Sequence, residues 1–287
     1  MSASGNATES QLQLMADWKD PPVIPLSWHR QLNGELELVQ QGKCCTAVIG
    51  PQGTGKSFAL RRAMASAVAS ASDSSALWGG DLTSAFYIIA ASATHPKDGL
   101  RLILPALRGW ALTISDDRRM GEAAMVSNIV GQMQLRGVRM LIIDEAQMMD
   151  PDPLDQVRLI YDECVSRGHE AGIVFVGTPG LEDRIAATGT LGQRVPRVVR
   201  STLLDFPWVE SHSPKLHPLM PQIAEELGTR RWKDLIQRRT TASGGKIRRL
   251  VEVLRFANAM ALKQKVPMAE VHIDLGVRLL ATDSSRQ

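Results

Sequence analysis

A short stretch near the N-terminal third of the chain reads Gly50-Pro51-Gln52-Gly53-Thr54-Gly55-Lys56-Ser57. An apolar run, Cys44–Ile49, precedes it, and a run of good helix formers, Lys56–Ser70, follows it. The spacing G-x-x-x-x-G-K-S between a strand and a helix is typical of a loop whose backbone N–H groups surround phosphate oxygens. The alternative is a glycine-rich turn that binds nothing, and the full match in this context argues against it.

Each position of this loop has an expected role toward a bound nucleotide and Mg²⁺. The glycines let the backbone approach the phosphates closely, and Lys56 is expected to reach the β- and γ-phosphates. The Ser57 hydroxyl is expected to ligate Mg²⁺. The predicted nucleotide-binding residues of this region are therefore Gly50, Pro51, Gln52, Gly53, Thr54, Gly55, Lys56, Ser57 and Phe58.

A second motif, Met140–Glu145, is an apolar strand that ends in two carboxylates, Asp144 and Glu145. In a parallel sheet this strand end lies at the same edge as the phosphate loop. Asp144 is expected to hold Mg²⁺ through water, and Glu145 is expected to polarise the attacking water. The string is only moderately specific alone, but the preceding phosphate loop strengthens it. The interval between the two motifs leaves room for one more strand and several helices.

A third apolar run, Ile173–Gly177, is followed by Thr178, whose hydroxyl is expected to detect the γ-phosphate. The dipeptide that follows Gly177 is also compatible with an ordinary turn. The position of Thr178, one strand after the Asp144 motif, favours the functional interpretation.

Three arginines lie before the last expected strand, Thr202–Phe206, and one of them is a candidate to act from a neighbouring subunit. Such an arginine can neutralise the charge that develops on the γ-phosphate in the transition state. The alternative for each is a solvated surface charge. In order of preference the candidates are Arg194, Arg197 and Arg200.

A glycine pair, Gly244-Gly245, precedes an expected helix whose first turn carries Lys246, Arg248 and Arg249. In a lid over the nucleotide, Arg248 or Arg249 could contact phosphate within the same subunit. A basic, solvated helix start explains the same residues equally well.

Apolar strands alternate with helices along the first two thirds of the chain, which predicts a parallel sheet covered on both faces. A Ser/Pro/His-containing loop, Ser211–His217, is expected after it, and only helical patterns follow. The predicted domains are a flexible tail over residues 1–20, which orders on a partner, an α/β domain over 21–210 and a helical lid over 211–287. The expected strands are Cys44–Ile49, Ala85–Ala91, Val138–Ile143, Gly172–Gly177 and Thr202–Phe206.

The composition bounds the location and the partners. The chain has 287 residues, 44% of them hydrophobic, and a formal net charge of only +3, too small to predict nucleic-acid binding by itself. Its three cysteines contain no C-x-x-C pair and are expected to be buried free thiols in a reducing, cytoplasmic setting. We find neither a secretory leader nor a membrane-spanning run, so no membrane association is expected.

The five elements stand in the order that resembles the AAA+ ATPases, from about Val23 to Leu280. Within that class, Leu141–Ala146 and Val174–Leu181 resemble the transposon-encoded regulators of the TnsC/TniB type, whose relatives include MuB and IstB. The resemblance implies a P-loop AAA+ fold with a five-stranded sheet and a small helical lid, and ATP with Mg²⁺ as ligands. The residues Gln147-Met148-Met149 depart from those relatives, a departure expected to leave the chemistry untouched.

The resemblance also implies partners and a function. Such proteins form rings or helical filaments on double-stranded DNA, mark a target site and recruit or activate a transposase, with ATP hydrolysis dismantling the assembly. A basic segment, Arg230–Arg255, holds nine Lys or Arg against two Asp or Glu, and a second basic region, Arg101–Arg119, is the alternative DNA contact. Competing hypotheses are a replication initiator or helicase loader, and a nucleotide-gated scaffold in which turnover is incidental.

Overall fold

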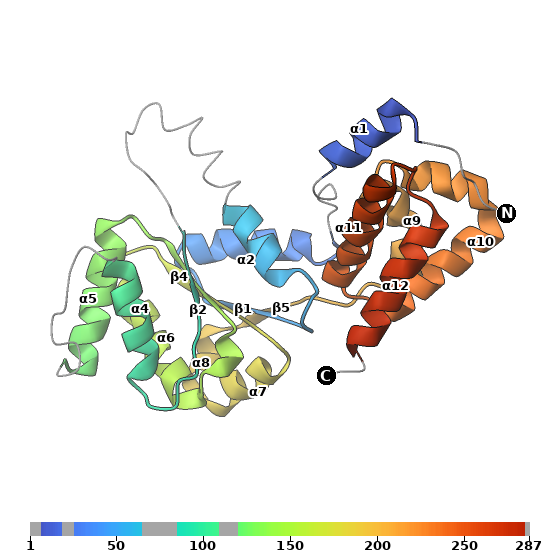
Figure 1. Cartoon of the computed structure of the whole chain (residues 1–287). Helices are drawn as coiled ribbons and strands as arrows, with labels where there is room; N and C mark the ends of the chain where they lie inside the picture. The colour runs from blue at the N-terminus through green and yellow to red at the C-terminus, as the bar shows by residue number, and fades with distance from the viewer. Residues whose placement is uncertain (1–6, 19–25, 65–84, 109–119, 285–287) are drawn as a thin grey trace. The chain divides into compact units, whose positions relative to one another are not determined.

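The computed structural model describes residues 7–18, 26–64, 85–108 and 120–284 (Figure 1). The chain divides into two compact units. The α/β unit comprises Leu26–Pro51 and Lys56–Ser201. The helical unit comprises Thr202–Gln287 with Met1–Pro25, and the loop residues Gln52–Gly55 are grouped with it. The proline-rich entry segment expected near residues 20–25 lies outside the described residues.

The α/β unit is built on five parallel strands in the order β2-β3-β4-β1-β5. The three central strands, β1, β3 and β4, are buried along their whole length because helices cover both faces of the sheet. The predicted α/β class with a five-stranded parallel sheet is therefore confirmed. The strands are β1 (Thr46–Ile49), β2 (Ala85–Ile89), β3 (Met140–Asp144), β4 (Gly172–Gly177) and β5 (Arg197–Arg200).

The last strand differs from the prediction. We expected it at Thr202–Phe206, but β5 is Arg197–Arg200, and residues 201–205 have no regular structure. The segment Arg-Val-Val-Arg pairs with β1 at the edge of the sheet, where only Val199 is fully buried. Charged residues are common on edge strands because one side of the strand faces solvent. Because arginines occupy both of its ends, β5 lacks the apolar pattern of a central strand, and the sequence did not predict it as a strand.

Helices cover the sheet on both faces, with α2 on one side and α4, α5 and α6 on the other (Figure 1). Ala47 and Ile49 of β1 point into a large apolar cluster with α4, α5 and α6. Residues 56–64 are helical and continue directly from the phosphate loop. The remaining helices are α2 (His29–Gln40), α4 (Asp98–Arg108), α5 (Glu122–Leu135), α6 (Pro151–Ser166), α7 (Gly180–Ala187) and α8 (Thr190–Arg194).

Within the described residues, the helical unit packs five helices around its own core, so its predicted helical character is observed. A non-helical glycine, Gly228, lies between the two halves of α10. Buried side chains from α9, α10 and α11 form the core with Met15 of α1. The helices are α1 (Glu9–Asp17), α9 (Phe206–Leu216), α10 (Met220–Ser243), α11 (Ile247–Gln264) and α12 (Glu270–Ser284).

Two local expectations were wrong in this unit. Ser211–His217, expected as a loop, lies mostly in α9, because Asp205 caps the first turn and Val209, Ser213 and Leu216 face the core at helical spacing. The N-terminal segment, expected as a loose tail, contains α1, which begins with a capping box at Thr8. The polar composition of that segment concealed one fully buried side chain, Met15.

A buried polar cluster holds α1 in the helical unit. The Asn258 Nδ2 donates to the backbone carbonyl of Met15 at 2.9 Å, and Asn258 Oδ1 lies 3.1 Å from His217 Nε2. The other ring nitrogen, His217 Nδ1, accepts from the Leu219 backbone N–H. Because Nδ1 accepts a hydrogen bond, the ring is the neutral tautomer with its proton on Nε2. Burial lowers the pKa of His217 to about 4, which keeps the ring neutral.

The three cysteines are free and Cys45 and Cys164 are buried, as expected, but Cys44 is only partly buried. Burial raises the pKa of the Cys45 thiol, and it raises the pKa of the Cys164 thiol to about 12. Burial and the charge of Glu35 also raise the pKa of Cys44. Among the helices in the described residues, none combines the length and the apolar character needed to cross a membrane.

Candidate nucleotide site at the carboxyl edge of the sheet

The loop that follows β1 has the backbone shape of a phosphate cradle. Gly53 and Gly55 have positive φ angles of 81° and 89°, which residues with a side chain rarely adopt. Lys56 is buried, and its Nζ donates to the carbonyls of Gly50 at 2.7 Å and Pro51 at 2.9 Å. Burial lowers the pKa of Lys56, and the charges of Asp144 and Glu145 partly offset this shift. The two loop carbonyls thus hold the Lys56 side chain across the loop.

The start of the loop passes very close to the segment after β5. The Ser201 backbone N–H donates to the carbonyl of Ile49 at 2.8 Å, which extends the pairing of the two strands. A Cβ built on Gly50 would lie 2.2 Å from the Ser201 carbonyl oxygen and 2.1 Å from its hydroxyl oxygen. The first glycine of the motif is therefore required for close packing against a neighbouring strand, in addition to phosphate access.

Ser57 and Asp144 meet at the same edge of the sheet. The Ser57 hydroxyl donates to Asp144 Oδ2 at 2.6 Å, although the two residues lie far apart in the sequence. The phenol of Tyr87, from the neighbouring strand β2, donates to the same oxygen. Burial and this hydrogen bond raise the pKa of Tyr87. Tyr87 was missed by the sequence analysis, because an aromatic residue inside a strand is most often a core residue.

Glu145 follows β3 with a strained backbone. Its φ of 55° lies in the left-handed region, which is uncommon for residues other than glycine. The Glu145 backbone N–H donates to Asp144 Oδ1 at 2.8 Å, which supports this conformation. Such strain is concentrated at functional sites in proteins. The turn directs the chain into a 3-10 helix, Ala146–Met148.

Thr178 and Gln147 lie beside these carboxylates. Thr178 directly follows β4, the strand between β3 and β1, so it lies at the edge that carries the other groups. Its backbone N–H donates to Gln147 Oε1 at 3.1 Å, and Gln147 Nε2 donates to Glu145 Oε2. Gln147, which we expected to leave the chemistry untouched, therefore contacts both Glu145 and Thr178. The signal in the sequence that pointed to this contact was the glutamine two positions after Glu145.

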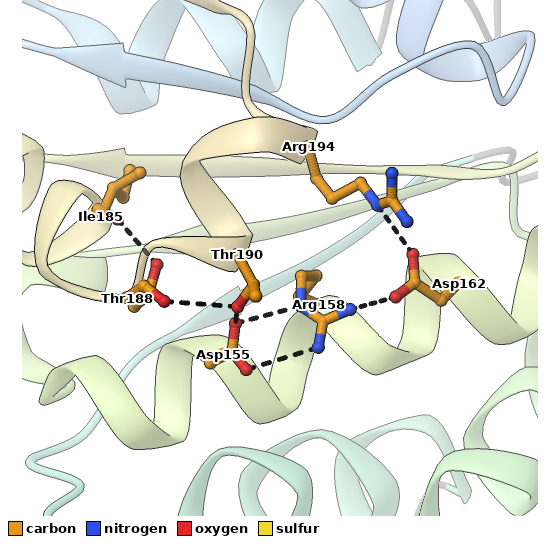
Figure 2. A network of polar contacts seen from close by, with 7 residues as sticks. All are labelled: Asp155, Arg158, Asp162, Ile185, Thr188, Thr190 and Arg194. Atoms are coloured by element: carbon orange, nitrogen blue, oxygen red, sulfur yellow. Dashed lines mark hydrogen bonds and ion pairs between the residues drawn. The ribbon is translucent and has the colours of Figure 1, made fainter.

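Arg194 lies far from this edge within its own unit. Arg194 is the last residue of α8, and its backbone carbonyl accepts a hydrogen bond from the Cys45 N–H just before β1. This contact lies at the amino ends of the strands, opposite the carboxyl ends that carry the other groups. Its Nε donates to Asp162 Oδ1 at 3.0 Å, in a network that joins α8 to α6 (Figure 2). Its side chain remains 47% exposed. The network also contains Asp155, Arg158 and Thr190.

The two arginines of β5 occupy different ends of the strand. Arg197 pairs in register with Thr46 at the start of β1, and its guanidinium lies 3.3 Å from Glu35. Arg200 pairs with Ile49 beside the phosphate loop and forms two hydrogen bonds of 2.6 Å with Glu182. Arg200 therefore lies at the end of β5 beside the phosphate loop, and Arg197 lies at the other end.

The remaining predicted residues are more dispersed. Phe58, in the first turn of the helix after the loop, is 60% exposed. Arg248 and Arg249 lie in the first turn of α11 in the helical unit, and the Arg248 side chain pairs with Glu252 at 3.1 Å. These two arginines belong to the helical unit, whereas Asp144 and Glu145 belong to the α/β unit.

The basic segment of the helical unit is partly neutralised. Arg239 is fully buried and cannot face DNA. Its neighbours form ion pairs with acidic residues of α9 and α12 that lie outside the segment: Arg231 and Arg238 with Glu270, Arg238 also with Asp274, and Lys233 with Glu210. The charge excess in the sequence therefore overstates the positive surface there. The alternative region, Arg101–Arg119, is described only as far as residue 108, and Arg101 pairs with Asp98.

The residues at the edge of the sheet fit a nucleotide with Mg²⁺. The loop has glycines where positive φ is needed, and a lysine is buried against it. A hydroxyl and a carboxylate lie 2.6 Å apart, and oxygen ligands of this kind are what Mg²⁺ prefers. The donor set therefore suits a hydrated Mg²⁺ ion beside a phosphate chain.

The fold and the loop define the class: the α/β unit is a P-loop NTPase domain. Residues 39–185, just over half of the chain, match the family model described as AAA domain, and the chain belongs to that family, with the AAA+ form of the fold. No curated protein sequence matches the chain.

Solved structures of AAA+ proteins share this fold at low sequence identity. The Aeropyrum pernix ORC2 protein matches with a TM-score of 0.62 and 14% identity over 93% of this chain and 71% of its own. The A. pernix ORC1 protein in complex with DNA matches with 0.58 and 16% over 92% and 68%. Domain III of the Thermotoga maritima replication initiation protein DnaA matches with 0.56 and 14% over 90% and 95%.

Proposed function

We propose that the protein is a Mg²⁺-dependent ATPase, and that the meeting of Ser57, Asp144 and Glu145 at one sheet edge is the observation that carries this proposal. Lys56 exchanges its carbonyl partners for phosphate oxygens, and Ser57 and Asp144 hold the hydrated metal. Mg²⁺ neutralises negative charge on the phosphates when it is bound. Glu145 accepts a proton from the attacking water as the bond between the γ-phosphorus and the bridging oxygen breaks, so the products are ADP and phosphate.

Thr178 and one exposed arginine complete the proposed machinery. The Thr178 hydroxyl contacts the γ-phosphate or the attacking water at the end of β4. Arg194 or Arg197 from a neighbouring subunit neutralises the transition-state charge, in keeping with their place at the far edge of the sheet. In this arrangement a second subunit completes each nucleotide-binding site. ATP binding then favours assembly, and Arg248 or Arg249 of the helical unit contacts phosphate within the same subunit.

The output of this ATPase, in our proposal, is regulation of DNA transposition. ATP-bound subunits assemble on double-stranded DNA, mark a target site and recruit or activate a transposase, and hydrolysis dissolves the assembly. The support is the resemblance of Leu141–Ala146 and Val174–Leu181 to regulators of that type. Reciprocity of linked equilibria requires that DNA strengthen ATP binding by the same factor by which ATP strengthens assembly.

Electron microscopy of the full chain with duplex DNA tests this proposal. We expect rings or filaments with DNA and a slowly hydrolysed ATP analogue together, and none with either alone. With ATP itself, Glu145→Gln should keep assemblies on DNA for at least about tenfold longer than the wild type, because it binds ATP but does not activate water. Lys56→Ala is the control that should form no assemblies. Single subunits under every condition would refute assembly as the output.

A role in replication initiation is the second candidate. Its support is that structures similar to this chain include origin-recognition proteins and a DnaA domain, although at this identity the likeness extends only to the fold. This candidate predicts that a replicative helicase, rather than a transposase, co-purifies with the DNA-bound assembly. A pull-down with purified candidates of both classes separates the two functions.

A further inference from the structure

Gln147 touches both strand ends that carry the proposed catalytic groups. Its Nε2 donates to Oε2 of Glu145, which follows β3, and its Oε1 accepts from the backbone N–H of Thr178, which follows β4. These strands are neighbours in the sheet. We infer that Gln147 is a positioning residue, which fixes the Glu145 carboxylate for water activation and ties its position to the end of β4. The inference rests on the proposed ATPase activity.

The orientation of the Gln147 amide follows from its partners. The Thr178 backbone N–H can only donate, so the atom facing it must be the amide oxygen. The amide nitrogen then faces the Glu145 carboxylate, to which it donates. A flipped amide would place two donors together at Thr178 and two acceptors together at Glu145. The bridge therefore has one polarity, and a glutamine is the side chain that satisfies both ends.

The backbone that carries Gln147 is also fixed. The Met148 N–H donates to the Glu145 carbonyl at 2.8 Å, which closes the 3-10 turn around Gln147. After this turn, Arg184 of α7 donates to the carbonyl of Met149 at 2.8 Å and pairs with Asp150. Because the turn is held at both ends, the backbone of Gln147 has a defined position relative to Glu145.

Gly177 provides the space for the bridge. A Cβ built on Gly177 would lie 2.5 Å from Gln147 Oε1 and 2.9 Å from a methyl carbon of Leu181. An alanine there must displace the amide or the leucine. The lack of a side chain at Gly177, the last residue of β4, therefore leaves the room that the Gln147 amide occupies.

The bridge leaves Glu145 prepared for its proposed task. Within the described residues, hydrogen bonding to Gln147 engages Oε2, so Oε1 is the oxygen left to accept from water. A carboxylate held through one oxygen samples fewer orientations, and productive geometry at the reacting atoms accounts for a large part of enzymatic rate. Loss of the bridge should therefore lower kcat and leave ATP binding nearly unchanged.

Steady-state ATP hydrolysis by the full chain with Mg²⁺ and duplex DNA tests the inference. Gln147→Met keeps the length of the side chain but removes both hydrogen bonds, and we expect kcat to fall at least about tenfold with KM for ATP within about twofold of the wild type. The matched control is Gln134→Met, the same substitution at an exposed position of α5, which should retain wild-type values.

The isosteric variant Gln147→Glu separates positioning from a merely structural role. It keeps the acceptor for the Thr178 N–H but places a second carboxylate against Glu145. Neighbouring carboxylates resist sharing negative charge, so the acid limb of the kcat–pH profile should move to higher pH by about one unit or more. A purely structural defect would scale the whole profile and leave its midpoint in place.

The outcomes distinguish the positioning role of Gln147 from the proposed ATPase activity. Wild-type turnover with an unchanged kcat in Gln147→Met, or a loss confined to KM, overturns the positioning role and leaves the ATPase proposal standing. A wild-type chain that binds ATP but never hydrolyses it overturns both. If Gln147→Met does not fold, as judged by thermal unfolding, Gly177→Ala takes its place: we expect a reduced kcat there too, and an unchanged kcat would overturn the inference.

Discussion

The two units of this protein both bury polar side chains, but they use them differently. In the α/β unit, Ser57, Tyr87 and Asp144 converge on one edge of the sheet, and charged Asp144 accepts hydrogen bonds that a metal ion could replace. In the helical unit, His217 and Asn258 satisfy each other and the backbone of α1, and the histidine is kept neutral. Both clusters are networks of hydrogen bonds, so hydrogen bonding alone does not tell them apart.

The difference lies in which partners the groups have. The helical cluster pairs each donor with a neutral acceptor, and nothing in it gains from a ligand, so its contribution is to folding. The edge cluster lies beside a lysine, Lys56, and a second carboxylate on a strained backbone, Glu145, next to a loop shaped for phosphate. We therefore expect substitutions in the edge cluster to reduce ATP turnover and substitutions in the helical cluster to reduce the stability of the fold.

The largest expected effect is in the edge cluster. Asp144→Asn keeps the shape of the side chain but removes the charge that holds Mg²⁺, so ATP turnover should fall by about a hundredfold to a thousandfold. The free energy of unfolding, measured by urea denaturation, should change by less than about 1 kcal/mol. A strongly destabilised variant with normal turnover per folded molecule would reverse our assignment of this cluster.

The next largest effect is in the helical cluster. Asn258→Leu leaves the His217 N–H and the Met15 carbonyl buried without partners, which should lower the free energy of unfolding by about 3 kcal/mol. Turnover per folded molecule should stay near that of the wild type. Asn128→Leu, at an exposed position of α5, is the matched control and should cost less than about 0.5 kcal/mol. Equal losses in both variants would contradict a special role for Asn258.

The smallest expected effect is the pH dependence that His217 confers. Its folded pKa, about 4, lies below the ordinary value of 6.5, so between these values the unfolded chain binds more protons and stability decreases as pH falls. Between pH 7 and pH 5 this residue should account for a loss of about 2 kcal/mol. Comparing urea denaturation of the wild type and His217→Asn at both pH values measures that contribution; identical pH slopes would exclude it.

Much of the fold and part of the site could be predicted from local patterns. The phosphate loop and the strand before Asp144 were recognisable because apolar runs and glycine spacing are short-range signals, and the structure brings Ser57 and Asp144 together as expected. β5 was misplaced because an edge strand tolerates Arg197 and Arg200 at its ends. The partly neutralised basic segment was unpredictable, because its acidic partners come from other helices.

The side chains that sequence reasoning missed share a physical cause. Tyr87 and Gln147 contribute through contacts with residues on neighbouring strands, and neither carries a charge that would mark it in the sequence. Their importance depends on register: Tyr87 is opposite Ile142 in the β2–β3 pair, close enough for its phenol to reach Asp144. Such pairings become visible only when the sheet order is known.

The state of the thiols has a practical consequence for following the motions of this protein. Because Cys44, Cys45 and Cys164 all have raised pKa values, little of the reactive thiolate is present at neutral pH, and the native cysteines should react slowly with maleimide dyes. A cysteine introduced at Leu135, which is 82% exposed at the end of α5, should then be labelled selectively. Fluorescence experiments on single molecules could therefore begin from the natural sequence.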